Sequence, residues 1–174
     1  MKLPRKAALS ILTTAAACVC GCGYSMAPQH PTNVGTVYVP VWTTGKEVYR
    51  RGLEIRLSEA VAKRIQQITP YRIADKTHAD TELSGTVELI PQKVLSFNPD
   101  TGLPRELEMT IVVNFVWKDL RSGKIIVKRN GLRSTGTYIP HEPFGEEFFQ
   151  GSEDVINRLA ERVVEAMEKD WEKG

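Results

Sequence analysis

Polar and apolar residues alternate most clearly between Glu106 and Lys118, which predicts a β-strand with one buried face. A second alternating stretch runs from Thr81 to Phe97, and Pro91 marks a bend or a sheet edge inside it. In each stretch the apolar residues share one parity, so we expect them on the core face. They are Leu83, Val87, Leu89, Leu95 and Phe97, followed by Leu107, Met109, Ile111, Val113, Phe115 and Trp117.

Two other segments repeat their apolar residues at helical intervals. The first runs from about Lys46 to Ile68 and should end before Pro70, because the residue before a proline disfavours helical backbone. The second lies near the C-terminus, where Ser152 is a suitable N-cap. Its apolar side carries Val155, Ile156, Leu159, Ala160, Val163, Met167 and Trp171.

Shorter segments complete the predicted order of elements. Thr36–Trp42 is β-branched and aromatic, which favours a strand whose end is marked by Pro40. Tyr71–Ala74 is expected to be extended, and Asp75–Ala79 to be a turn. After a turn at 119–123, residues 125–137 form a β-segment with a bulge near Asn130-Gly131, where the parity fails. Tyr138–Gly151 is expected to be an irregular connection.

This order predicts an α+β fold: a two-layer sandwich in which two helices pack on one face of a mostly antiparallel sheet. Residues 35–174 are enough for one domain. The other sheet face must meet water or a partner, and the apolar Val112 and Val116 on that parity favour a partner. We expect one shared core to contain Leu57, Ile65, Val113, Phe115, Leu159 and Val163.

Residues 1–21 have the order of a bacterial export signal, with Lys2, Arg5 and Lys6 ahead of a short apolar run. The segment Val19-Cys20-Gly21-Cys22 resembles the lipobox, which places cleavage before Cys22 and a lipid on its sulfur. A plain secretory signal cut nearby is the weaker alternative. Residues 22–34 show no apolar period and read as a lipidated flexible tether.

Cleavage leaves a mature chain with 20 basic and 21 acidic side chains, so its net charge is about −1 and gives no support to nucleic-acid binding. Cys22 would be the single remaining cysteine, which excludes an internal disulfide. No residue set has the arrangement of a catalytic site. His141 with Glu142, Glu146 and Glu147 invites a metal interpretation, but Pro143 and Gly145 make a solvated loop the better one. We therefore predict no enzyme, no metal and no cofactor other than the lipid.

One stretch of the chain is strongly cationic, since residues 118–133 contain a single acid, Asp119. Such a patch binds phosphate or carboxylate groups through charge and through the forked arginine side chain. The alternative is a solvated edge hairpin whose lysines oppose aggregation. The candidate binding residues are Lys118, Arg121, Lys124, Lys128, Arg129 and Arg133.

Several segments together resemble the lipopolysaccharide-assembly lipoprotein family LptE. They are Cys22-Gly23-Tyr24, the helix from Leu53, the segment 79–87, the strand 106–113 and the C-terminal amphipathic helix. The resemblance implies a non-enzymatic lipoprotein of the cell outer membrane, facing the periplasm or inside a barrel lumen. Its implied partners are the LptD-type β-barrel, which it would support and plug, and lipopolysaccharide, which it would bind during transport and assembly at the cell surface.

Two other functions agree with parts of the sequence. Val39-Pro-Val-Trp42 and the segment 79–85 also look like the domain of LpoB-type lipoproteins, accessory activators of cell-wall synthases, and of related secretion lipoproteins. Those usually have a longer tether, whereas Gly23–Val34 reaches at most ~40 Å and favours a partner in the same membrane. A periplasmic hydrolase has only the His141 loop in its favour.

Overall fold

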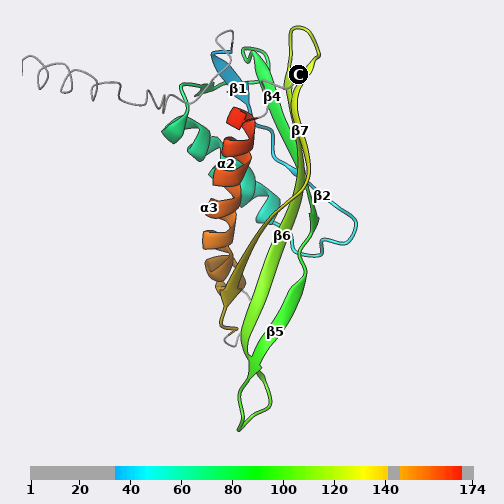
Figure 1. Ribbon diagram of the computed structural model, residues 1–174, viewed down its shortest axis with the longest axis vertical. Coiled ribbons are helices and arrows are strands. Elements are labelled where there is room, and N and C mark those ends of the chain that lie inside the picture. The colour runs from blue at the N-terminus through cyan, green and yellow to red at the C-terminus, as the bar shows by residue number, and fades with distance from the viewer. Residues whose placement is uncertain (1–33, 141–145, 170–174) are drawn as a thin grey trace, which may run out of the picture.

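The computed structural model describes residues 34–140 and 146–169. The predicted signal peptide, Cys22, nearly all of the tether, His141 and Trp171 lie outside these residues. Two helices, α2 (Leu53–Ile68) and α3 (Glu146–Lys169), pack on one face of a long curled sheet (Figure 1). The predicted α+β sandwich is confirmed.

The sheet is built around β6 (Pro104–Asp119), which pairs antiparallel on both of its edges. One edge takes β4 (Thr81–Leu89) and then β5 (Gln92–Phe97), and the other takes β7 (Ile125–Tyr138). Three short strands on the β4 side pair in parallel: β1 (Thr36–Tyr38), β2 (Thr43–Thr44) and β3 (Arg72–Ile73). The sheet is therefore mixed, although its long strands are all antiparallel.

The core lies between the helices and the inward parity of the sheet. Alternate residues of β6 from Met109 to Trp117 are at most 1% exposed, as the sequence pattern predicted. The six residues expected to share one core belong to a single buried cluster. Continuous apolar contact between helices and sheet supplies most of the stability of such a two-layer domain.

Helix α2 begins at Leu53, later than the predicted Lys46. Gly52 precedes it with φ 92°, a left-handed conformation that a glycine adopts without a steric penalty. The preceding segment is held beside the sheet, because the Gly45 N–H donates to the Val87 carbonyl at 2.7 Å. The predicted end before Pro70 is confirmed.

The predicted strand Thr36–Trp42 is divided by Pro40, which has no N–H for the ladder. Only Thr36–Tyr38 pairs as β1, and the chain pairs with β4 again at Thr43. Between them Trp42 turns inward, is 2% exposed and donates its backbone N–H to the Ser58 hydroxyl of α2 at 2.8 Å. The segment thus joins the sheet to the helix layer.

The apolar parity expected through Phe97 fails from Leu89 onward. The register of β4 on β6 shifts between Val87 and Leu89, and Leu89, Leu95 and Phe97 are 41%, 43% and 62% exposed. The bend itself was predicted, and β4 and β5 lie on either side of it. The β5–β6 hairpin extends beyond the helices (Figure 1), so its far part has no helical layer over it.

The predicted bulge at Asn130-Gly131 is confirmed. Val113 faces Leu132 and Phe115 faces Arg129, so two residues of β7 oppose Asn114 alone. Gly131 has φ 67°, and its N–H donates to the Asn114 side-chain oxygen at 2.7 Å. The bulge is therefore fixed by a side chain of the central strand.

Helix α3 begins at Glu146, so Ser152 is not its N-cap but a fully buried residue inside it. The predicted irregular connection Tyr138–Gly151 is correspondingly too long, since β7 runs to Tyr138 and the helix includes Gly151. The apolar side from Val155 to Met167 is buried as predicted. Among the described residues, neither helix is long and apolar enough to cross a membrane.

Candidate binding surface

The six cations predicted as one patch are separated by the fold into two groups. Lys118 and Arg121 face acidic residues of or beside β4: the Lys118 ammonium lies 3.5 Å from Glu82, and the Arg121 guanidinium is paired with Asp80. An ion pair satisfies much of the attraction that a cation would offer to a ligand. These two residues therefore contribute less free positive charge than the sequence suggested.

Asp80 holds three segments together at this end of the sheet. Its carboxylate accepts hydrogen bonds from the Gly35 and Thr36 N–H groups at 2.9 and 3.0 Å, and from the Arg121 side chain. The Gly35 N–H and then the Arg121 guanidinium lower the pKa of Asp80 from 3.8 to about 2. Asp80 thereby fastens the start of β1 to the β6–β7 turn.

The turn is also fixed from within by Asp119. Its carboxylate accepts the N–H groups of Arg121 and Ser122 at 2.7 and 3.0 Å. The Ser122 and Arg121 N–H groups lower the pKa of Asp119. The only acid of the cationic stretch is thus part of the turn structure.

The other four cations, Lys124, Lys128, Arg129 and Arg133, are exposed in or beside β7. Directly opposed residues of antiparallel strands lie on the same face. Lys128 faces Val116 and Arg133 faces Val112, which places both cations on the face away from the helices, called the outer face below. Arg129 faces Phe115, so it lies on the helix side of the sheet.

The outer face combines an apolar strip with polar neighbours. Val112 and Val116 are half-buried on β6, and Leu89 of β4 is paired with Val112. Around them, hydroxyl pairs join neighbouring strands at 2.8 Å, Thr43 with Thr86 and Thr110 with Thr135. Apolar side chains bordered by Lys128 and Arg133 suit an amphiphilic, anionic ligand or a partner surface with the same chemistry.

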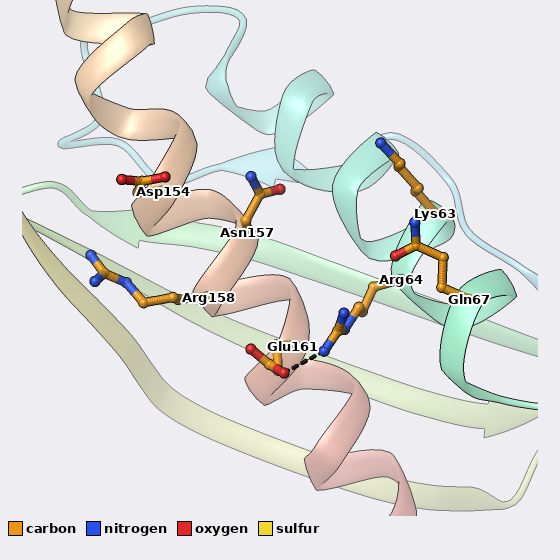
Figure 2. A pocket seen from close by; sticks show the side chains of 7 residues that line it. All are labelled: Lys63, Arg64, Gln67, Asp154, Asn157, Arg158 and Glu161. Atoms are coloured by element: carbon orange, nitrogen blue, oxygen red, sulfur yellow. Dashed lines mark hydrogen bonds and ion pairs between the residues drawn. The ribbon is translucent and has the colours of Figure 1, made fainter.

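Acidic and basic side chains of α3 point toward different neighbours. Glu153 and Glu161 of α3 pair with Arg56 and Arg64 of α2. Figure 2 shows Arg64 and Glu161 pointing toward each other in a hollow of about 470 Å³ between the helices, while Arg158 extends away from α2. Glu153 and Glu161 therefore serve the contact of α3 with α2.

The arginines of α3 were missed by reasoning from sequence, because the helix as a whole is acidic. Arg158 and Arg162 turn toward β7 and donate hydrogen bonds to the backbone carbonyls of Thr135 and Arg133. Their spacing of four residues, which places both on one flank of a helix, was the signal available. No group of three His, Cys, Asp or Glu side chains within the described ranges is arranged to hold a metal ion.

The arrangement of two helices on a curled mixed sheet is similar to that of several solved structures. Uncharacterized lipoprotein B from Nitrosomonas europaea matches with a TM-score of 0.57 and 14% identity over 88% of this chain and 95% of that chain. A hypothetical protein from Chlamydia trachomatis matches with a TM-score of 0.52 and 8% identity over 77% and 98%. At such identities these likenesses show the fold alone. No curated protein matches by sequence.

A family model for LptE, described as lipopolysaccharide-assembly, matches residues 34–169. This span contains every helix and strand of the described residues. The chain therefore belongs to the LptE lipopolysaccharide-assembly family, as the resemblance predicted. The family is not enzymatic.

Proposed function

We propose that the mature chain is anchored in the cell outer membrane through lipid on Cys22, supports and plugs an LptD-type β-barrel, and binds lipopolysaccharide during its transport to the cell surface. The observation that carries this proposal is the family match over residues 34–169. The predicted lipobox ending at Cys22 and the short tether after it agree with a partner in the same membrane.

The outer face is the surface that we propose for the lipopolysaccharide contact. Lys128 and Arg133 on this face would bind the phosphate groups by charge-assisted hydrogen bonds, for which the guanidinium fork is well suited. Lys124, beside the start of β7, and Arg129, on the helix side of β7, would add positive charge at the same sheet edge. Val112 and Val116 would contact apolar parts of the same ligand. Lys118 and Arg121 would hold the end of β6 and the following turn against β4, since Glu82 and Asp80 already pair with them.

The experiment is a titration of the unlipidated mature domain with lipopolysaccharide at low and high salt. Changing Lys124, Lys128, Arg129 and Arg133 together to Gln should weaken binding by about tenfold or more, which corresponds to ~1.4 kcal/mol. It should also reduce the salt dependence, because fewer charges are screened. All four side chains are exposed, so the melting temperature should be unchanged.

A matched control changes four other exposed cations to Gln: Arg51, Lys63, Lys76 and Lys93. It removes the same charge from other parts of the surface, so its affinity should stay close to that of the wild type. Equal affinity and equal salt dependence in both variants would show that the β7 cations are only a solvated edge.

A further inference from the structure

β7 forms an edge of the sheet, since within the described residues it pairs only with β6. In an antiparallel ladder, every second residue of an edge strand directs both its N–H and its C=O away from its neighbour. Arg133 and Thr135 are two such residues. Thr110, which faces Thr135, donates its N–H to the Pro91 carbonyl on the other edge of β6, and the Arg133 and Thr135 carbonyls accept hydrogen bonds from α3. Their N–H groups therefore point outward as well.

Arg158 and Arg162 reach this edge from one flank of α3. Arg158 donates to the Thr135 carbonyl at 3.1 Å, and Arg162 donates to the Arg133 carbonyl. Gly136 permits the close approach, because a Cβ there would lie 2.5 Å from a Val155 methyl group and 2.8 Å from an Arg158 nitrogen. The absence of a side chain at Gly136 thus lets α3 pack close enough for both arginines to reach the edge of β7.

A groove of about 540 Å³ lies between this edge and α3, and Arg133, Arg158 and Arg162 are among its lining residues. Of its two acids, Glu161 is directed to Arg64 of α2, and Glu165 also has an interaction partner. Each guanidinium that bonds a β7 carbonyl has further N–H donors for a second acceptor. The groove therefore presents cationic donors beside outward-facing peptide groups.

We propose that this groove binds an extended acidic segment of a partner protein as an additional strand on β7. The partner backbone would donate N–H groups to the Arg133 and Thr135 carbonyls and accept from their N–H groups. Arg158 and Arg162, released from those carbonyls, would bind carboxylates of the segment in bidentate pairs. The proposal rests on this geometry and does not depend on the lipopolysaccharide or barrel functions proposed above.

Spacing favours a strand over an isolated anion. Residues four apart on a helix are separated by ~6 Å along its axis, and side chains on the same face of a strand repeat every ~6.8 Å. Two carboxylates separated by one residue therefore match Arg158 and Arg162. A phosphate group alone would leave the outward peptide groups of β7 unused.

The test uses a synthetic octapeptide of alternating Glu and Thr, blocked at both ends, titrated into the mature domain and followed by fluorescence anisotropy and amide hydrogen exchange. The peptide should bind and should slow exchange of the Arg133 and Thr135 amides. An alternating Lys and Thr peptide should not bind. A Glu peptide with Pro at its central Thr should bind about tenfold less well, because it lacks a ladder N–H.

Changing Arg158 and Arg162 together to Gln should weaken the Glu peptide by about tenfold or more, which is the loss of two charge-assisted contacts. The matched control changes Arg56 and Lys63 to Gln, which removes the same charge from the α2 side of the helical layer. Three results would overturn the proposal. One is that the Pro peptide binds as tightly as the unmodified Glu peptide. Another is that the Glu peptide binds more tightly to the Arg158 and Arg162 variant, which would mean that the arginines block the strand edge. The third is that inorganic phosphate slows exchange of the Arg133 and Thr135 amides while the peptide does not bind.

Discussion

The indole ring of Trp42 lies directly against Gly85, so that a Cβ at Gly85 would be 2.5 Å from the ring carbon Cε3. The contact joins the segment after Pro40 to the middle of β4. Trp42 is 2% exposed and its backbone N–H is bonded to the Ser58 hydroxyl of α2, so the residue is held in place and its ring has little room to move. Gly85 is therefore required by packing and not by backbone conformation.

Replacing Gly85 by Val should lower the free energy of unfolding by about 1–3 kcal/mol, the usual cost of forcing extra atoms into a packed site. Denaturant unfolding measures this change. The control is Ser84→Val on the same strand, whose neighbour across the sheet is Val116 of the outer face, and it should be nearly neutral. Equal stability of the two variants would contradict the Trp42 packing described above.

Asp80 should make the domain sensitive to acid. Its pKa is about 2 in the folded protein against an ordinary 3.8, so the ionised carboxylate stabilises the fold above pH 3.8. This contribution is lost as the pH falls from about 4 to about 2. Asp80→Asn should lower stability at neutral pH and flatten the stability curve over that acid range, whereas exposed Asp100→Asn should not. Urea unfolding between pH 2 and pH 7 checks both.

Truncation of Phe115 to Ala should cost about 3–5 kcal/mol, because the ring is buried in the centre of the core. A loss below about 1 kcal/mol would mean that the strand parity is misassigned. The matched change is Val116→Ala, one position along β6 on the outer face, for which we expect a smaller loss.

Lipid on Cys22 should keep the mature protein with membranes. Several acyl chains at ~0.8 kcal/mol for each buried CH₂ greatly exceed the weak hold of one myristoyl chain. Cys22→Ser should release the protein or leave it unprocessed, as seen by fractionation and by mobility on a denaturing gel. An unchanged fraction and mobility would exclude lipidation at this residue.

Much of the fold was predictable from the sequence because its long elements follow strict periods. The alternation from Met109 to Trp117 defines the buried face of β6, and the parity failure at Asn130-Gly131 marks the bulge. Local patterns gave wrong predictions where contacts between distant segments decide the start of a helix or the burial of a side chain. Ser152 has the chemistry of an N-cap but lies inside α3, and Phe97 shares the parity of core residues but is 62% exposed.

The candidate surface was less predictable, since charge partners come from distant parts of the chain. Arg121 and Asp80 are 41 positions apart, so the cationic stretch could not show that this charge is already paired. The net charge of α3 also gave no sign that its acidic and basic side chains point in different directions, with Glu161 facing α2 and Arg162 facing β7. Only the packing of both helices on the sheet brings Arg158 and Arg162 to the β7 edge.

The most direct test of the proposed function is to isolate the lipidated mature protein from solubilised outer membranes and identify its partners by mass spectrometry. We expect an outer-membrane β-barrel of the LptD type together with lipopolysaccharide, and loss of both with the Cys22→Ser variant. Recovery of a cell-wall synthase in place of a barrel, or of neither barrel nor lipopolysaccharide, would contradict the assignment.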